Sequence, residues 1–256
     1  MTHLDSFIKD RRQSKSVLLM THVIYGYPTV EKSLDFMRVL LNKGVDLLEV
    51  QFPFSDPVAD GPTITTACHD ALENAPTFDE YLNDLNQLSK QYPDTRILIM
   101  SYLNPLLQYG AEQLASKSNG GLHGIIVPDL PLEAARLMEP MNATTAAPVW
   151  LLTPDTSDER IAQVTAAAKG MIYCVSRKGV TGQTTNGMEG VKQYIDRVRN
   201  NTDVPLGVGF GIQSADDIRL LHGIADVAIV GSGLLNAYRK KGLDGVSTLT
   251  DELLAA

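Results

Sequence analysis

The sequence predicts an α/β fold in which eight parallel strands and the helices between them close into one barrel. Three observations favour it. The chain of 256 residues has the length of a single α/β barrel, although two small domains would also fit. Short apolar runs recur along the chain, and their continuous hydrophobicity is typical of strands that are buried on both faces. No linker, low-complexity tract or charge block marks a domain boundary, so we expect residues 1–256 to form one domain.

The expected strands share an apolar run that ends at a polar, glycine or proline residue. In chain order they are 17–25, 47–51, 97–101, 124–127, 149–152, 171–175, 205–208 and 227–230. An open doubly wound sheet would also alternate strands with helices, but it usually has fewer strands. No G-x-G-x-x-G motif follows the first strand here, so the barrel is favoured.

The segments between the strands show the periodicity of amphipathic helices. Apolar residues recur at helical spacing in 34–40 and 78–88, and Thr77 with Glu80 predicts a capping box at the start of the second segment. Gly170 is well placed to end a helix. Further helices are expected at 132–138, 158–168, 189–200, 215–221 and 246–254, with an extra N-terminal helix at 4–9.

The formal net charge of −8 argues against nucleic acid or an anionic membrane as the main partner, because both select for basic patches. A small anionic substrate is still compatible with this charge, since backbone amides and helix ends can bind it locally. Cys68 and Cys174 have no metal or redox spacing, and none of the five histidines has metal spacing to another histidine or a cysteine. We therefore expect no metal site.

No export signal or membrane span is expected near the N-terminus. Basic residues occur there, but Thr21 and His22 interrupt the apolar run 17–24 that follows them. Together with two cysteines that have the character of free, buried thiols, this predicts a cytoplasmic protein.

Residues 49–63, EVQFPFSDPVADGPT, are the most informative stretch of the sequence. Glu49 lies inside an apolar strand, so it must be at the strand end or in a polar site. Asp56 and Asp60 follow in one loop, and three prolines restrict the conformations of that loop. Because barrel active sites lie at the carboxyl ends of the strands, this segment is predicted to be a catalytic loop.

The last three predicted strands each end in glycines, which let backbone amides approach a ligand closely. Helices that begin near Ser214 and at Gly231 would add positive dipole ends. Each glycine alone could merely turn a corner, but glycines at three successive exits predict the phosphate site that barrels form in this region. These glycines are Gly179, Gly182, Gly209, Gly211, Gly231 and Gly233.

Six segments, in this order, resemble the tryptophan synthase alpha subunit family. They are EVQFPFSDPVADGPTI, SYLNPLLQYG, IIVPDLP, YCVSRKGVTG, GVGFGI and IVGSG, and they extend from the second predicted strand to the eighth. Each fragment alone is weak evidence, but the set is specific. The resemblance implies a TIM (β/α)8 barrel that cleaves indole-3-glycerol phosphate into indole and glyceraldehyde 3-phosphate in tryptophan biosynthesis. It implies no cofactor in this chain, and a β subunit that carries PLP as the partner in an α2β2 heterotetramer.

By resemblance, Glu49 is the general acid and base, and Asp60 contacts the indole N–H and balances its charge. Glu49 is expected to be the more desolvated of the two and to have a raised pKa. As alternatives, Glu49 could be paired with a neighbouring base and Asp60 could be a turn residue before Gly61. The joint occurrence of both carboxylates in this motif favours the catalytic interpretation.

The resemblance implies further site residues. The indole pocket would be lined by Met100, Tyr102, Ile126 and Tyr173, with His22 where the family usually has an aromatic residue. Thr181 is expected to close over the site and bond Asp60, whereas Arg177 is expected to be structural. Gly182, Gly211, Gly231 and Ser232 would bind phosphate. The surface facing the β subunit would include Asp56, Pro57, Asn104 and Pro131, which would be exposed loop residues on the chain alone.

The sequence departs from the family pattern near the site. Gln51 stands where the family has glycine, Thr65 where it often has glutamine, and Thr21 and His22 where it usually has proline and phenylalanine. These departures could change the position of the loop or the stacking of indole. Two other hypotheses are another phosphate-binding barrel isomerase or lyase, which the motif set disfavours, and a non-catalytic α-like subunit that binds phosphate and activates a β partner.

Overall fold

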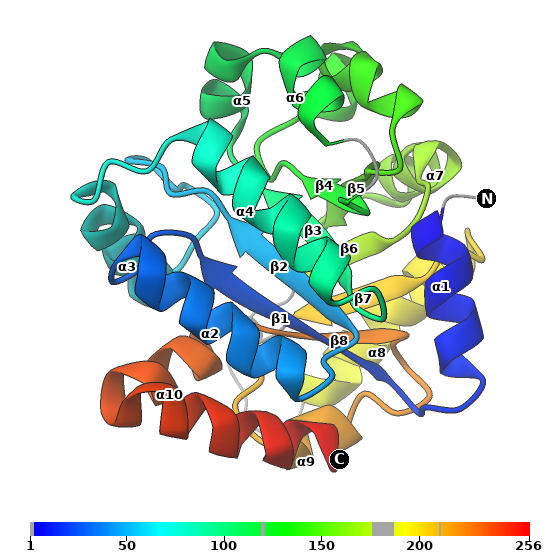
Figure 1. Ribbon diagram of the computed structural model, residues 1–256. Coiled ribbons are helices and arrows are strands. Elements are labelled where there is room, and N and C mark those ends of the chain that lie inside the picture. Colours follow the sequence, from blue (N-terminus) through cyan, green and yellow to red (C-terminus); the bar gives the residue numbers. More distant parts are fainter. Residues whose placement is uncertain (1–2, 119–120, 176–186, 210) are drawn as a thin grey trace.

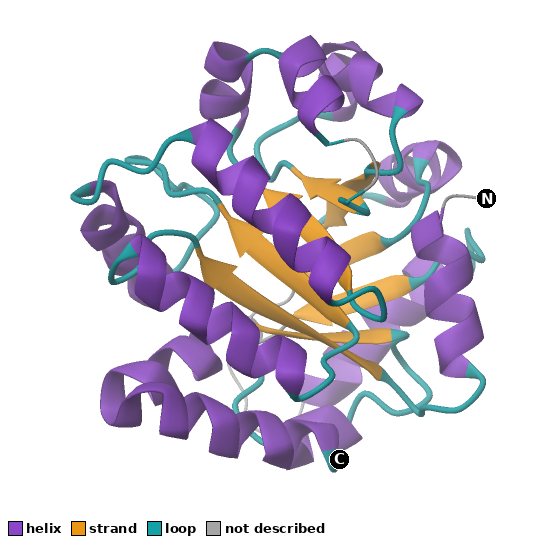
Figure 2. Cartoon of the chain, in the orientation of Figure 1, coloured by secondary structure: helices purple, strands orange, loops and turns teal. Residues whose placement is uncertain are grey.

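Eight parallel strands close into a barrel in which each strand is hydrogen-bonded to the next and β8 to β1. The structure, a computed structural model, describes residues 3–118, 121–175, 187–209 and 211–256. Figure 2 shows the strands as an inner layer with helices around it. The strands are β1 (Leu18–Ile24), β2 (Leu47–Gln51), β3 (Arg96–Met100), β4 (Gly124–Ile126), β5 (Ala147–Leu152), β6 (Ile172–Val175), β7 (Leu206–Gly209) and β8 (Val227–Val230). The predicted barrel is confirmed, and each strand lies within two residues of its expected bounds.

The predicted helices occur in the structure, and the Thr77 capping box is formed. The helices are α1 (His3–Arg12), α2 (Val30–Asn42), α3 (Pro62–Leu72), α4 (Phe78–Gln91), α5 (Leu103–Tyr109), α6 (Ala111–Lys117), η1 (Leu132–Ala143), α7 (Asp158–Ala167), α8 (Gly187–Arg199), α9 (Ala215–Arg219) and α10 (Ser232–Leu254).

Three helices were missed because their apolar stripes are weak. In α3 the buried residues are the small side chains of Ala67, Cys68 and Ala71, and α5 and α6 each bury a single leucine. Short or small stripes give little helical periodicity in the sequence.

Two predicted helices differ in form from the expectation. The segment expected at 132–138 is the longer 3-10 helix η1, with Pro140 inside it. Proline lacks a backbone donor, which disfavours a regular α-helix there. The segment expected at 246–254 is the second half of α10, and Lys241 and Gly242 leave helical geometry between the two halves.

The barrel interior is filled by every second residue of the strands. On β1 these are Leu18, Met20 and His22, and on β2 they are Leu47, Glu49 and Gln51. Leu4 and Ile8 of α1 belong to the same interior cluster as Leu47. Helix α1 therefore closes the end of the barrel at which the strands begin (Figure 1). The opposite, carboxyl end is left for the loops that carry the predicted site.

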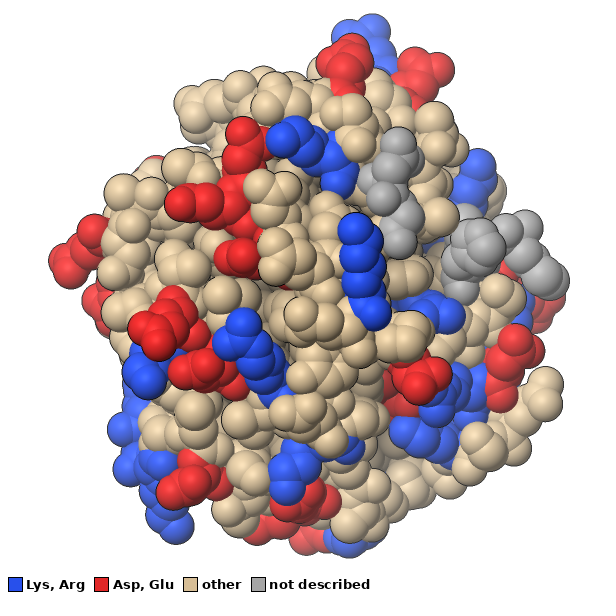
Figure 3. Space-filling view, in the orientation of Figure 1, with Lys and Arg blue, Asp and Glu red and all other residues tan. Residues whose placement is uncertain are grey.

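The outer surface carries charges of both signs. Lys and Arg side chains are interspersed with Asp and Glu over the face shown in Figure 3, and no single-sign field covers that face. None of the helices among the described residues is long and apolar enough to cross a membrane.

Candidate active site

Glu49 lies inside the barrel on β2, between His22 of β1 and Leu98 of β3 in the strand register. The side chain is only 4% exposed. Burial raises the pKa of Glu49 to about 7, the charge of His22 lowers it, and the charge of Asp60 raises it further. The expected raised pKa of Glu49 is confirmed, and a carboxyl group with this pKa can both give and accept a proton near neutral pH.

Asp60 lies in the loop between β2 and α3, close to the mouth of the barrel. The backbone N–H of Asp60 donates to the Pro57 carbonyl over 2.9 Å, and α3 begins two residues later with a proline in its first turn. Two side chains donate to Oδ2 of Asp60, each over 2.8 Å: Gln51 through Nε2 and Tyr102 through its hydroxyl. Side chains from the barrel interior thus fix the Asp60 carboxylate. A residue that served only in the turn before Gly61 would not need these two bonds.

Tyr102 connects the loop to the end of β3. Its hydroxyl oxygen accepts the Ala59 N–H over 3.1 Å, so its proton is directed to Asp60. Burial and the charge of Asp60 raise the pKa of Tyr102 above its ordinary value, which keeps the hydroxyl protonated as a donor. The ring of Phe54 packs against Tyr102 with the ring centroids 5.5 Å apart.

Three buried polar atoms at the barrel mouth have no hydrogen-bond partner among the described residues. They are Nε2 of His22, Oε2 of Glu49 and Oε1 of Gln51. Because buried polar groups are nearly always paired, such a group of atoms on neighbouring strands indicates a place where a polar ligand binds.

An apolar wall faces these atoms. Met100, Tyr102 and Ile126 lie in one interior cluster, against which Tyr173 and Phe54 pack. Burial raises the pKa of Tyr173, and the charges of Glu49 and then Asp60 add to the shift, which places this ring near both carboxylates. The four predicted pocket residues are therefore brought together. Phe54 was missed, although an aromatic residue between prolines and carboxylates was a usable signal.

Gly231, the first residue after β8, lies against His22 of β1. A Cβ on Gly231 would lie 3.0 Å from Nδ1 of His22, and one on Gly233 would lie 2.9 Å from the Ile212 carbonyl. At Gly233 the contact is with backbone, so glycine is required there, and at Gly231 a larger residue would displace the His22 ring. Gly231 precedes Ser232 at the start of α10, which has no side-chain cap. The backbone there is suited to an anion.

The remaining residues that the sequence predicted for the site differ in whether they lie among the described residues. Gly211 is exposed and has a φ of +79°, a conformation that glycine adopts readily. The predicted phosphate-site glycines Gly179 and Gly182 lie outside the described residues, as do Thr181, expected to close over the site, and Arg177, expected to be structural. Within the described ranges, no group of three or more histidine, cysteine or acidic side chains is placed to hold a metal ion.

Three of the four predicted interface residues, Asp56, Asn104 and Pro131, are exposed, as expected for loops on the chain alone. Pro57 is instead buried, because the loop turns back on itself through the bond from Asp60 to the Pro57 carbonyl. The Leu103 N–H donates to Asp129 over 2.8 Å, which joins the loops after β3 and β4.

The exposed apolar residue Val58 belongs to the same loop as Asp56, with 78% of its surface accessible. His69 lies exposed on α3, and its Nε2 is 2.9 Å from the Ser55 carbonyl. This contact connects the loop to α3. Thr65, a departure from the family pattern, bonds the Gly61 carbonyl.

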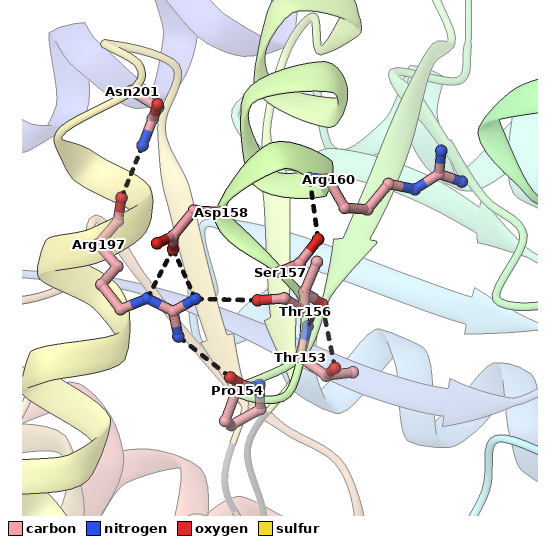
Figure 4. A network of polar contacts seen from close by, with 8 residues as sticks. All are labelled: Thr153, Pro154, Thr156, Ser157, Asp158, Arg160, Arg197 and Asn201. Atoms are coloured by element: carbon pink, nitrogen blue, oxygen red, sulfur yellow. Dashed lines mark hydrogen bonds and ion pairs between the residues drawn. The ribbon is translucent and has the colours of Figure 1, made fainter.

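The loop after β5 is held by structural contacts. Arg197 of α8 donates to the carbonyls of Pro154 and Thr156 and forms an ion pair with Asp158 over 2.7 Å (Figure 4). Ser157 caps α7 through the Arg160 N–H. This network fixes the loop between β5 and α7, and none of its described members contacts Glu49 or Asp60.

Comparison with known proteins agrees with this arrangement. The family model described as "Tryptophan synthase alpha chain" matches residues 8–254. The tryptophan synthase alpha chain of Desulforapulum autotrophicum is 38% identical over 98% of this chain and 99% of its own length. That of Roseiflexus castenholzii is 40% identical over 92% and 91%.

Solved structures of the same family also resemble this chain. A crystal structure of tryptophan synthase from M. tuberculosis, in an aminoacrylate-bound form, matches with a TM-score of 0.90 and 30% identity over 100% of this chain and 99% of that one. With the barrel, the site and near full-length relatives in agreement, the chain belongs to the tryptophan synthase alpha chain family.

Proposed function

We propose that Glu49 and Asp60 carry out the retro-aldol cleavage of indole-3-glycerol phosphate in this chain. As a tryptophan synthase alpha chain, the protein is a lyase of tryptophan biosynthesis. The observation that carries the assignment of roles is the pair itself: a buried carboxyl group with a pKa near 7 beside a second carboxylate that Gln51 and Tyr102 hold in place.

Cleavage requires two proton transfers, and both are assigned to Glu49 in this proposal. Its protonated form delivers a proton to the indole ring carbon that bears the glycerol chain. The resulting carboxylate removes the proton from the hydroxyl on the adjacent side-chain carbon, a carbonyl forms there, and the carbon–carbon bond breaks. The bonding electrons return to the ring, which leaves indole and glyceraldehyde 3-phosphate. A pKa near 7 keeps both forms of Glu49 accessible.

Asp60 is proposed to stabilise the ring while positive charge develops at its nitrogen. Both protein donors contact Oδ2 of Asp60, so Oδ1 is the oxygen proposed to accept the indole N–H. A fixed carboxylate at this position favours the charged transition state over the neutral ground state.

The rest of the site is proposed to bind the two ends of the substrate. Met100, Tyr102, Ile126 and Tyr173 would contact the indole ring, with His22 at the wall next to Glu49. Gly211, Gly231 and Ser232 would bind the phosphate through backbone amides, and Gly182 and Thr181 are predicted to complete the site. The proposed reaction requires no cofactor in this chain.

We also propose that the chain works in the cytoplasm with a PLP-containing β subunit in an α2β2 heterotetramer. The exposed residues Asp56, Val58, Asn104 and Pro131 belong to loops at the same end of the barrel as Glu49. A partner bound over these loops could receive indole directly. No observation favours the alternative of a non-catalytic subunit.

Replacing Glu49 tests the assignment. Glu49→Gln keeps the shape of the side chain but removes the proton donor, so kcat should fall by at least about 100-fold while substrate binding changes little. Indole release measures the first quantity and calorimetric binding of glycerol 3-phosphate checks the second. Glu112→Gln, on the exposed surface of α6, is the matched control. Turnover close to that of the unmodified chain would refute the role of Glu49.

A further inference from the structure

Gln51 is a fully buried glutamine at the end of β2, with 0% of its surface exposed. It points into the barrel on the same face as Glu49, and its neighbours in the strand register are Ile24 and Met100. Glutamine is seldom fully buried, because its amide group must replace the hydrogen bonds that water would make. The position of Gln51 therefore requires an explanation beyond packing.

The amide is satisfied on only one side. Nε2 donates to Oδ2 of Asp60 over 2.8 Å. Because an ionised carboxylate only accepts, the N–H end of the amide must face Asp60. This orientation leaves Oε1 buried without a partner among the described residues. A buried acceptor without a hydrogen bond reduces stability. Where such an acceptor lies next to a reactive group, a role in the functional site is the usual explanation.

Tyr102 completes the arrangement from the other side. Its hydroxyl accepts from the Ala59 N–H and donates to the same oxygen of Asp60, over 2.8 Å. The two donors come from the ends of β2 and β3, which are neighbouring strands with a fixed register. Two bonds to one oxygen fix the orientation of the carboxylate, and within the described part of the chain no hydrogen bond reaches Oδ1.

We infer that Gln51 is a positioning residue, which together with Tyr102 fixes the Asp60 carboxylate so that Oδ1 faces the ligand before the substrate binds. The inference rests on the proposed function, since it assumes that Asp60 receives the indole N–H. Pre-organisation of this kind lowers the cost of orienting the carboxylate during the reaction. If Gln51 served only to hold the loop, its removal would affect folding and the whole site instead.

Gln51→Met tests the inference, because methionine has nearly the same length and volume but cannot donate to Asp60. Loss of one charge-assisted hydrogen bond should lower kcat/KM for indole-3-glycerol phosphate by about 10- to 100-fold. Gln51→Asn, which keeps an amide but is too short to reach Asp60, should show the same loss. This second variant covers the case in which Gln51→Met does not fold.

Binding measurements separate positioning from a structural role. Gln51→Met should weaken the binding of an unreactive indole-alkyl phosphate by about 10-fold or more, while the affinity for glycerol 3-phosphate, which has no indole, stays unchanged. In an Asp60→Ala background, Gln51→Met should cause no further loss of indole-alkyl phosphate binding. Thr21→Val is the control, since the hydroxyl of Thr21 is also buried without a partner among the described residues, but Thr21 alternates with the inward-facing His22 on β1 and therefore faces the helix layer.

Two results would overturn the inference. One is unchanged kcat/KM and unchanged indole-alkyl phosphate binding in both Gln51 variants. The other is a parallel loss of affinity for both phosphates, which is the signature of a disturbed loop. If the unmodified chain releases no indole, the proposed function fails, and the binding measurements still decide the role of Gln51.

Discussion

At the scale of single residues, Glu49 is a buried carboxyl group whose proposed catalytic role comes with a dependence of stability on pH. Its carboxyl group is buried in the barrel, and burial raises its pKa from 4.5 to about 7. A raised pKa was expected for Glu49 together with the role that the family resemblance implies, whereas the apolar strand alone left a position at the strand end open. The bonds from Gln51 and Tyr102 to Asp60 were not predicted, since they depend on the path of a loop that local patterns do not define.

The raised pKa of Glu49 makes stability depend on pH. The folded protein keeps this proton up to about pH 7, whereas the unfolded chain loses it near pH 4.5, so the contribution of Glu49 is full below pH 4.5 and is lost as the pH rises through 7. Glu49→Gln does not titrate. Relative to the unmodified chain, its free energy of unfolding should therefore rise by roughly 2 to 3 kcal/mol between pH 5 and pH 8.

Urea unfolding of both proteins at the two pH values measures this difference. Taking the change between pH values cancels any constant effect of the substitution. An equal difference in stability at pH 5 and pH 8 would show that Glu49 ionises in the folded chain as it does in water.

At the scale of elements, the strands were easier to predict than the helices. Buried parallel strands give continuous apolar runs, whereas α3, α5 and α6 bury too few large side chains to show a helical period. The kink in α10 is a second example. Gly242 has a φ of +59°, and a Cβ on Gly245 would lie 2.5 Å from the Ala237 carbonyl. The sequence shows the two glycines, but it does not show that the two halves of α10 approach each other closely at Gly245.

Alanine substitutions at two glycines should therefore have opposite effects. Gly245→Ala forces the two halves of α10 apart and should lower the free energy of unfolding by about 1 to 3 kcal/mol. Gly190→Ala, on α8, meets no atom within 4 Å and should stabilise the chain by up to about 1 kcal/mol through helix propensity. Urea unfolding at constant pH measures both. Equal changes in the free energy of unfolding for the two substitutions would contradict the close contact between Gly245 and the Ala237 carbonyl.

At the scale of the whole molecule, the barrel has one closed and one open end. Helix α1 closes the end at which the strands begin, with Leu4 and Ile8 fully buried in the interior cluster. The carboxyl end carries the two carboxylates, the unpartnered polar atoms and the glycines near α10. On the proposed assignment of Glu49 and Asp60, stability and chemistry are separated along the barrel axis, as is general for this fold.

This separation predicts a substitution that affects stability but not activity. Ile8→Ala should lower the free energy of unfolding by about 2 to 5 kcal/mol, because it leaves a cavity at the closed end, while kcat stays within about 2-fold of the unmodified value under folding conditions. Lys9→Ala, on the exposed side of α1, should change stability by less than about 1 kcal/mol. A large loss of kcat in folded Ile8→Ala protein would show that the two ends are coupled.

The resemblance to a family supplied the roles of Glu49 and Asp60, and the geometry adds reasons for those roles within this chain. It brings His22, Glu49, Gln51, Asp60 and Tyr102 to one mouth of the barrel. Gln51, which stands where the family has glycine, contacts Asp60 through its side-chain amide. Secondary-structure propensities do not predict this contact, because the side chains of Gln51 and Asp60 meet only when the loop folds over the end of β2.

The most direct test of the central claim is indole release from indole-3-glycerol phosphate by the purified chain, alone and with a tryptophan synthase β subunit. The account predicts that indole and glyceraldehyde 3-phosphate form in equal amounts, and that Glu49→Gln abolishes nearly all of this release. No indole from the folded, unmodified chain in either condition would contradict the account and favour a non-catalytic subunit.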